Sequence, residues 1–262
     1  MLMAVVLLSL SAGADEHPLS ISLADGDARV AFTGEYRARF LHNGGKDFNP
    51  GANFDAVTQR VRVGLAVELW EKFRFVAELQ DVRAWGEETD PSADFAANAF
   101  DLHQGYLEVK PLPWLTLQVG RQEMRYDAQR LIGVGAWADQ SRAFDAVRAR
   151  VETKHYAAHF FFAKLAEKDS ANGATLDKDF GGLWFRASRL AYFRPSLYAL
   201  IDTDYAVDRV RHTYGLFVDG EFNGFKYATE FYYQTGKKGG TSIDAFLAAA
   251  NVSYRFDLPL SP

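Results

Sequence analysis

Apolar and polar residues alternate along much of the chain with a period of two. In VAFTGEYRARF (30–40), apolar side chains such as Phe32 and Tyr36 share one face, whereas Arg37 and Arg39 share the other. The same alternation returns in the segments 57–69, 73–80, 147–152, 225–234 and 246–256. This period is that of a β-strand, because successive side chains point to opposite faces. The pattern predicts an all-β protein whose strands each have one apolar and one polar face.

The connections between these segments alternate between long and short. The long connections are 42–55, 86–99, 123–141, 166–178, 202–209 and 235–244. The short connections are 70–72, 110–114, 152–154, 191–195 and the Asn-Gly pair at 223–224, which indicates a type I′ hairpin. A soluble antiparallel sandwich shows the same residue alternation, but short turns on one side and long loops on the other are typical of outer-membrane barrels. We therefore predict an antiparallel transmembrane β-barrel with about twelve visible strands of membrane-crossing length.

The N-terminal residues resemble a secretory signal. Residues 1–10 are apolar, and Ala12-Gly13-Ala14 supplies small residues for cleavage before Asp15. We expect a signal peptide at 1–14 and an outer-membrane β-barrel domain at 15–262, located in the bacterial outer membrane. The alternative is a frayed apolar N-terminus of a cytosolic protein.

Composition narrows the chemistry. The chain contains no cysteine, so it forms no disulfide and has no thiolate nucleophile. Its net charge of -5 argues against a nucleic-acid partner. The negative charge gathers in the long connections, however, whereas arginines recur on the polar faces of the predicted strands.

These arginines are the candidate lining of a solute path. From the alternation we place there Arg37, Arg39, Arg60, Arg62, Arg74, Arg148 and Arg150, with Glu35, Glu68, Glu78 and Glu152 as paired acids. Any one arginine alone is more readily explained as a structural partner of a neighbouring glutamate. Collectively they outnumber the inward acids, which favours an electropositive lumen.

Several motifs resemble those of the alginate-export family of outer-membrane β-barrel porins. They are VGRQEMRYDAQRLIG (119–133), SRAFDAVRARVE (141–152), DVRAWGEE (81–88) and DLHQGYLEV (101–109). The resemblance implies a barrel of about eighteen strands with an arginine-rich constriction for anionic polysaccharide or related solutes. It places Arg121, Arg125 and Arg130 at the top of a strand and in a loop that folds into the mouth. It places Arg142, Arg148 and Arg150 on the returning strand.

Two points remain open at this stage. The alternation Leu115, Leu117, Val119 directs Arg121 toward lipid, unless a bulge at Gly120 reverses the facing; otherwise Arg121 lies above the apolar band and snorkels. The ending DLPLSP (257–262) reads as a turn into a further strand, so we expect a C-terminally short fragment of a larger barrel. Alternatively, AAANVSYRF (248–256) is the terminal strand.

The sequence shows no catalytic or cofactor motif. His155 and His159 lie on one strand face about 13 Å apart, too far to share a metal ion. The loop DSANGATLDKD favours a plain Asn-Gly turn over bound calcium. We therefore expect no enzyme activity, no cofactor and no metal site.

The function that these features favour is a passive channel for anionic solutes, including acidic polysaccharide such as alginate. The expected partners are outer-membrane lipid, anionic oligosaccharide or polysaccharide or small anions, and periplasmic export partners. One alternative is a barrel that serves as a platform for a hydrolase or adhesin. Another is an exported carbohydrate-binding β-protein without transport.

Overall fold

The computed structural model describes residues 5–11, 19–23, 27–43, 54–85, 100–167 and 177–256. Over these residues the chain is all β apart from one 3-10 turn, η3 (Tyr205–Val207), so the predicted fold class is confirmed. None of the described residues belongs to a helix that is long and apolar enough to cross a membrane. The chain divides into two compact units, Met1–Glu108 with Gly120–Ala143, and Val109–Val119 with Phe144–Pro262.

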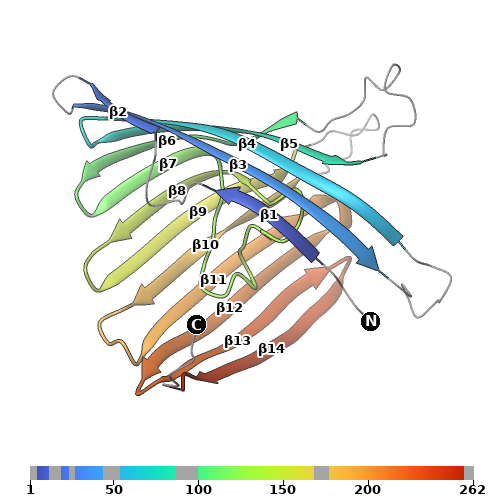
Figure 1. The fold of residues 1–262 in the computed structure, drawn as a ribbon. Coiled ribbons are helices and arrows are strands. Elements are labelled where there is room, and N and C mark those ends of the chain that lie inside the picture. The colour runs from blue at the N-terminus through green and yellow to red at the C-terminus, as the bar shows by residue number, and fades with distance from the viewer. Residues whose placement is uncertain are drawn as a thin grey trace. The chain divides into compact units, whose positions relative to one another are not determined.

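The first unit is built from the N-terminal strands (Figure 1). They are β1 (Val5–Ser11), β2 (Leu19–Leu23), β3 (Ala28–Asn43), β4 (Phe54–Leu69), β5 (Phe73–Ala84) and most of β6 (Phe100–Leu112). Their hydrogen-bonded order is β1-β3-β4-β5-β6, and β2 also pairs with β3. β1 falls within the segment predicted as a signal peptide and pairs antiparallel with β3; removal of residues 1–14 stays a prediction.

The second unit contains the remaining strands, each paired antiparallel with the next in the chain. They are the first residues of β7 (Leu115–Gln122), then β8 (Phe144–Glu152), β9 (Tyr156–Ala166), β10 (Lys178–Ala187), β11 (Arg194–Asp204), β12 (Arg209–Phe222), β13 (Phe225–Lys238) and β14 (Thr241–Tyr254). Among the described residues, β14 has one strand partner, β13. Continuation into a larger barrel stays a prediction.

On β3, β4 and β7 the strands bury polar side chains and expose apolar ones. On β4 the side chain of Val63 is 59% exposed, whereas its neighbour Arg62 is only 8% exposed. On β7 the exposed Leu117 precedes the buried Gln118. A water-soluble sheet has the opposite arrangement. Exposed apolar rows with polar rows behind them are what a strand needs when lipid lies outside and water inside.

Two short turns follow from residues that tolerate left-handed backbone. Asn223 (φ 48°) and Gly224 (φ 81°) close β12 onto β13, which confirms the predicted hairpin. Gly239 (φ 53°) and Gly240 (φ 80°) close β13 onto β14 in the same way. The prediction of a long connection at 235–244 was therefore wrong, because pairing continues to Lys238 and Thr241.

One more of the predicted long connections is short. Four residues, 205–208, separate β11 from β12, so the predicted long connection at 202–209 was also wrong. The connections at 44–53, 86–99 and 168–176 lie outside the described residues, including the Asn-Gly loop weighed for calcium. The connection at 123–143 is described in full and carries the candidate site.

Candidate functional site

Four arginines project from the polar faces of β3 and β4. We call Arg37, Arg39, Arg60 and Arg62 the arginine cluster. Arg37 lies directly opposite Arg60 in the strand register, and all four residues are more than nine-tenths buried. Like charges opposite one another destabilise a sheet, and a buried charge without a partner costs several kcal/mol. The cluster therefore depends on groups that other segments supply.

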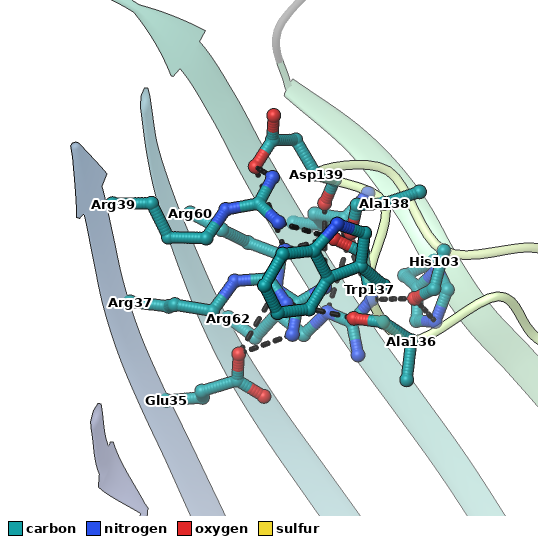
Figure 2. Close-up of polar contacts among 12 residues, drawn as sticks. Glu35, Arg37, Arg39, Arg60, Arg62, His103, Ala136, Trp137, Ala138 and Asp139 are labelled. Atoms are coloured by element: carbon teal, nitrogen blue, oxygen red, sulfur yellow. Dashed lines mark hydrogen bonds and ion pairs between the residues drawn. The ribbon is translucent and has the colours of Figure 1, made fainter. Parts of the chain in front are cut away.

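The connection between β7 and β8 supplies many of these groups through its backbone. We call residues 123–143 the inner loop. Arg37 donates to the carbonyl oxygens of Ala136 (Nη1, 2.8 Å) and Ala138 (Nη2, 2.7 Å), and Arg39 donates to that of Trp137. Figure 2 shows these contacts converging on three successive loop residues. Carbonyl oxygens carry only partial charge, so these three contacts solvate the guanidinium groups without neutralising them.

Two carboxylates bind Arg37, Arg39 and Arg60 of the cluster. Asp139 of the inner loop accepts hydrogen bonds from Arg39 and from Thr58 Oγ1 (3.0 Å), and its Oδ1 lies 3.6 Å from Arg37 Nη2. Glu35 of β3 accepts from Arg60, with its Oε1 2.9 Å from Nε. Each of these carboxylates therefore serves a different part of the cluster (Figure 2).

An aromatic ring from the loop covers the same arginine that Asp139 binds. The Trp137 ring centroid lies 5.3 Å from Arg39 Cζ, within the range of a cation–π contact. The Trp137 side chain is nevertheless 56% exposed. The ring adds to the docking of the loop on Arg39 and also presents an open surface.

Arg62 is held by a separate network at the base of the loop. Its Nε and Nη2 donate to Gln80 Oε1 at 2.8 and 2.6 Å, and Nη2 also donates to Ser141 Oγ. Glu78 and Glu123 lie 3.8 and 3.7 Å from Arg62 Nη1. These contacts tie β4 and β5 to both ends of the inner loop.

Glu123 is the most strongly perturbed acid of this network. Burial alone would raise its pKa, but hydrogen bonds with His103 and Arg125 outweigh that effect and lower the pKa to about 2. The His103 ring on β6 is buried, and its Nε2 lies 2.8 Å from Glu123 Oε1. Glu123 is therefore ionised at neutral pH and anchors the start of the loop.

The inner loop has a small core of its own. Met124, Tyr126, Ile132 and Val134 are almost fully buried. Backbone hydrogen bonds from Tyr126 N to Ile132 O (3.2 Å) and from Arg142 N to Val134 O (2.7 Å) join its two halves. Because these contacts lie within residues 124–142, the loop is internally ordered as well as docked.

Arg121 does not join the arginine cluster. It lies on the β7 face that carries the exposed Leu117 and Val119, and its guanidinium is 3.5 Å from Asp101. Gly120 has φ 122°, and a Cβ there would lie 2.3 Å from the carbonyl oxygen of Gly105, so glycine is required. The alternation nevertheless continues to the buried Gln122. Of the two alternatives for Arg121, a bulge that reverses the facing at Gly120 therefore does not occur, and the position of Arg121 above the apolar band stays a prediction.

The remaining predicted arginines of the first unit lie outside the cluster. Arg125 and Arg130 are exposed on the inner loop, and Arg125 bonds Glu123. Arg142 is exposed and precedes β8, whereas the resemblance placed it on that strand. Arg74, at the start of β5, is 3.3 Å from Glu68 and 3.4 Å from Glu108.

In the second unit, arginines are paired mostly with side chains of their own sheet. Arg148 donates to Gln118, and the predicted acid Glu152 bonds His159 at 3.0 Å. Arg150 lies half-buried on the same face of β8 as Arg148. The sequence analysis missed two further groups, in which Arg186 and Arg194 share Asp219 while Arg209 and Arg211 share Asp202. The alternation of apolar and polar residues along β11 and β12 could have indicated these groups.

The site offers recognition of anions. Among the described residues, no group of three or more His, Asp or Glu side chains is placed to hold a metal ion. The arginine cluster instead presents several planar donors to oxygen acceptors, which is the chemistry that binds carboxylates.

Comparison with known families agrees with this geometry. The family model described as "Alginate export" matches residues 28–262. The chain belongs to the Alginate export family. The predicted resemblance, which is strongest over residues 119–151, is therefore confirmed, and the match covers nearly the whole chain. Comparison with curated proteins gives no match. The Alginate export family consists of outer-membrane β-barrel transport proteins, and the antiparallel all-β fold fits that class.

Proposed function

We propose that this Alginate export protein is a channel of the bacterial outer membrane that passes anionic solutes, with acidic polysaccharide as the solute class. The observation that supports this most directly is the arginine cluster on the polar face of β3 and β4. Among the described residues, Arg37, Arg39 and Arg60 are paired with two carboxylates, Asp139 and Glu35. Arg62 has two of its own, Glu78 and Glu123, at 3.8 and 3.7 Å. The three arginines next to the tip of the inner loop therefore carry one positive charge more than the carboxylates that bind them.

Guanidinium groups suit this role because they stay charged at every physiological pH and bind carboxylates through two parallel hydrogen bonds. In a narrow lumen their field attracts anions and repels cations. The polymer passes by diffusion, and selectivity comes from charge. No covalent step is required.

Lipid contact is the second part of the proposal. Exposed Phe, Leu, Val and Tyr side chains form the outer rows of the strands, with examples at Phe32, Val63, Phe162 and Phe231. Lipid is the solvent that these rows favour. Cell fractionation should recover the protein from outer membranes with detergent only, and recovery as a soluble periplasmic monomer would contradict the proposal.

Ion selectivity tests the channel directly. The full-length protein in planar bilayers, under a KCl gradient, should give a reversal potential that favours chloride. Changing Arg148→Glu together with Arg150→Glu should weaken or reverse that preference, because both side chains lie on the polar face of β8. An acidic oligosaccharide should also block the current less in the double variant.

Arg121→Glu is the matched control. It makes the same kind of substitution, at one position, on the strand face that carries Leu117 and Val119. Its reversal potential should equal that of the wild type. If the double variant also keeps the wild-type value, Arg148 and Arg150 only brace the wall, and this part of the proposal fails.

A further inference from the structure

We propose that Arg37, Arg39 and Thr58 form a binding site for the carboxylate of an acidic sugar, which Asp139 of the inner loop occupies in this structure. A sugar carboxylate that enters the site displaces Asp139 and releases the loop. This inference rests on the proposed channel function and adds the site at which the solute acts.

The site has the composition of a carboxylate receptor. Asp139 Oδ1 accepts from the Arg39 guanidinium and from Thr58 Oγ1 at 3.0 Å, and it lies 3.6 Å from Arg37 Nη2. All three wall residues are more than nine-tenths buried on adjacent strands. The receptor is therefore fixed in the sheet, whereas its occupant belongs to a loop about a hundred residues away in sequence.

The occupant does not balance the charge of the receptor. Arg37 and Arg39 carry two positive charges, and Asp139 is the one inner-loop carboxylate among their described contacts. The other loop acceptors are neutral carbonyl oxygens of Ala136, Trp137 and Ala138. In addition, the buried Nε of Arg39 has no hydrogen-bond partner among the described residues. A ligand that carries a carboxylate and further oxygen atoms meets donors that the loop leaves unused.

Exchange of one carboxylate for another avoids the main energetic barrier. Removing the partner of a buried charge is strongly destabilising because the remaining charge is left unpaired. A sugar carboxylate takes the place of Asp139, and the hydroxyl and ring oxygens of the sugar take the places of the loop carbonyl oxygens that Arg37 and Arg39 lose. Asp139, whose side chain is already 27% exposed, then moves into water. Glu35 makes a different kind of contact, because it joins two strands of the wall and is not displaced with the loop.

Competition between Asp139 and the ligand predicts the direction in which the binding affinity changes when Asp139 is removed. When a site is available only in a fraction of molecules, the apparent affinity falls by that fraction. Removing the internal competitor should therefore strengthen binding of an external carboxylate. If Asp139 merely braced the loop, its removal would leave binding unchanged or weaken it.

The test is calorimetric titration of the full-length protein in detergent with D-glucuronate, and with glucose as the neutral counterpart. Asp139→Asn should bind glucuronate more tightly than the wild type, by up to about fivefold, and neither protein should bind glucose at that site. Arg39→Gln should lose glucuronate binding. Asp127→Asn is the matched control, because it removes a carboxylate from the same loop at a position (φ 46°) that asparagine tolerates. It should bind as the wild type does.

Equal or weaker glucuronate binding by Asp139→Asn would overturn the inference. Hydrogen exchange of the wild type provides a second measurement that depends on no variant. Glucuronate should accelerate exchange of the backbone amides of residues 133–142, whereas glucose should not. Unchanged or slower exchange would also overturn the displacement. The channel proposal itself is judged separately by the reversal potential, which needs no movement of Asp139.

Discussion

Arginines on the polar faces of the two units are satisfied in different ways. In the first unit, Arg37 and Arg39 reach backbone carbonyl oxygens and one carboxylate of a distant loop. In the second unit, Arg186 on β10 and Arg194 on β11 share Asp219 on β12, so all three side chains belong to consecutive strands of the sheet. The first arrangement is assembled from a separate segment, whereas the second is built into the sheet.

This difference separates two roles for the same residue type. A carboxylate that belongs to the sheet offsets part of the arginine charge permanently and strengthens the wall. A docked loop solvates buried arginines and offsets part of their charge only while it stays docked. In the first unit, the contacts of the buried arginines therefore depend on a loop that can undock. In the second unit, the contacts of the arginines are part of the sheet.

The comparison requires that both groups of arginines lie on the face away from lipid. Val63→Arg places a new arginine on the opposite face, beside the buried Arg62. Unfolding in lipid vesicles should show a loss of about 2–4 kcal/mol if the position lies at the bilayer midplane. Val63→Ile is the control and should change little. A neutral effect of Val63→Arg would reverse the assignment of the faces.

The anchor of the inner loop should give the next largest effect, and it should depend on pH. The folded-state pKa of Glu123 is lowered from 4.5 to about 2. Because the folded pKa is depressed, its stabilisation is fully present above about pH 4.5 and is lost as the pH falls toward 2. The wild type should exceed Glu123→Gln by up to about 3 kcal/mol at pH 7, and the gap should narrow below pH 4.5. A gap independent of pH would contradict the ionic anchor.

Within the second unit, Asp219→Asn should destabilise the wall. Both arginine partners lose their carboxylate, whose oxygen atoms lie 2.5 Å from Arg186 Nη2 and Arg194 Nη2. The three side chains are a fifth to a third exposed, so we expect about 2 kcal/mol, below the value for a fully buried pair. Asp244→Asn at the exposed start of β14 is the control. Equal stability of both variants would remove the distinction between the units.

The smallest effect on stability is expected for Asp139→Asn. The carbonyl contacts of Arg37 and Arg39 remain, and Asp139 is partly exposed. We expect a loss below about 1 kcal/mol, measured by the same unfolding assay as Asp219→Asn. A loss as large as that of Asp219→Asn would show that the loop is an integral part of the wall.

Local sequence signals predicted the strands because the alternation is a property of neighbouring residues. The alternation around Arg62 and Val63 fixed the two faces, and Asn223-Gly224 fixed a hairpin. The Gly239-Gly240 pair indicates a tight turn just as clearly, but we predicted a long connection there because long and short connections alternated along the rest of the chain. Membership of the Alginate export family could also be recognised from the sequence, because the family's motifs are short continuous segments.

The docking of the inner loop on β3 and β4 could not be predicted from the sequence in this way. The contacts of Arg37 with Ala136 and Ala138 join residues about a hundred positions apart and use backbone oxygens, which every residue possesses. No residue type marks such an acceptor. The sequence therefore indicated the arginines of β3 and β4 as lining residues. For the loop it indicated Arg125 and Arg130, and not the backbone that contacts Arg37 and Arg39.

The central claim is that the inner loop covers the arginine cluster, and a reversible cross-link tests it most directly. The chain contains no cysteine, so Thr58→Cys with Asp139→Cys introduces the sole thiol pair, at two positions whose side chains are in contact. With a short thiol cross-linker, the account predicts an intramolecular bridge and a low single-channel conductance that rises when the bridge is reduced. The variant with Thr58→Cys alone should not respond. Failure of the pair to bridge, or a conductance that is equal before and after reduction, would contradict the account.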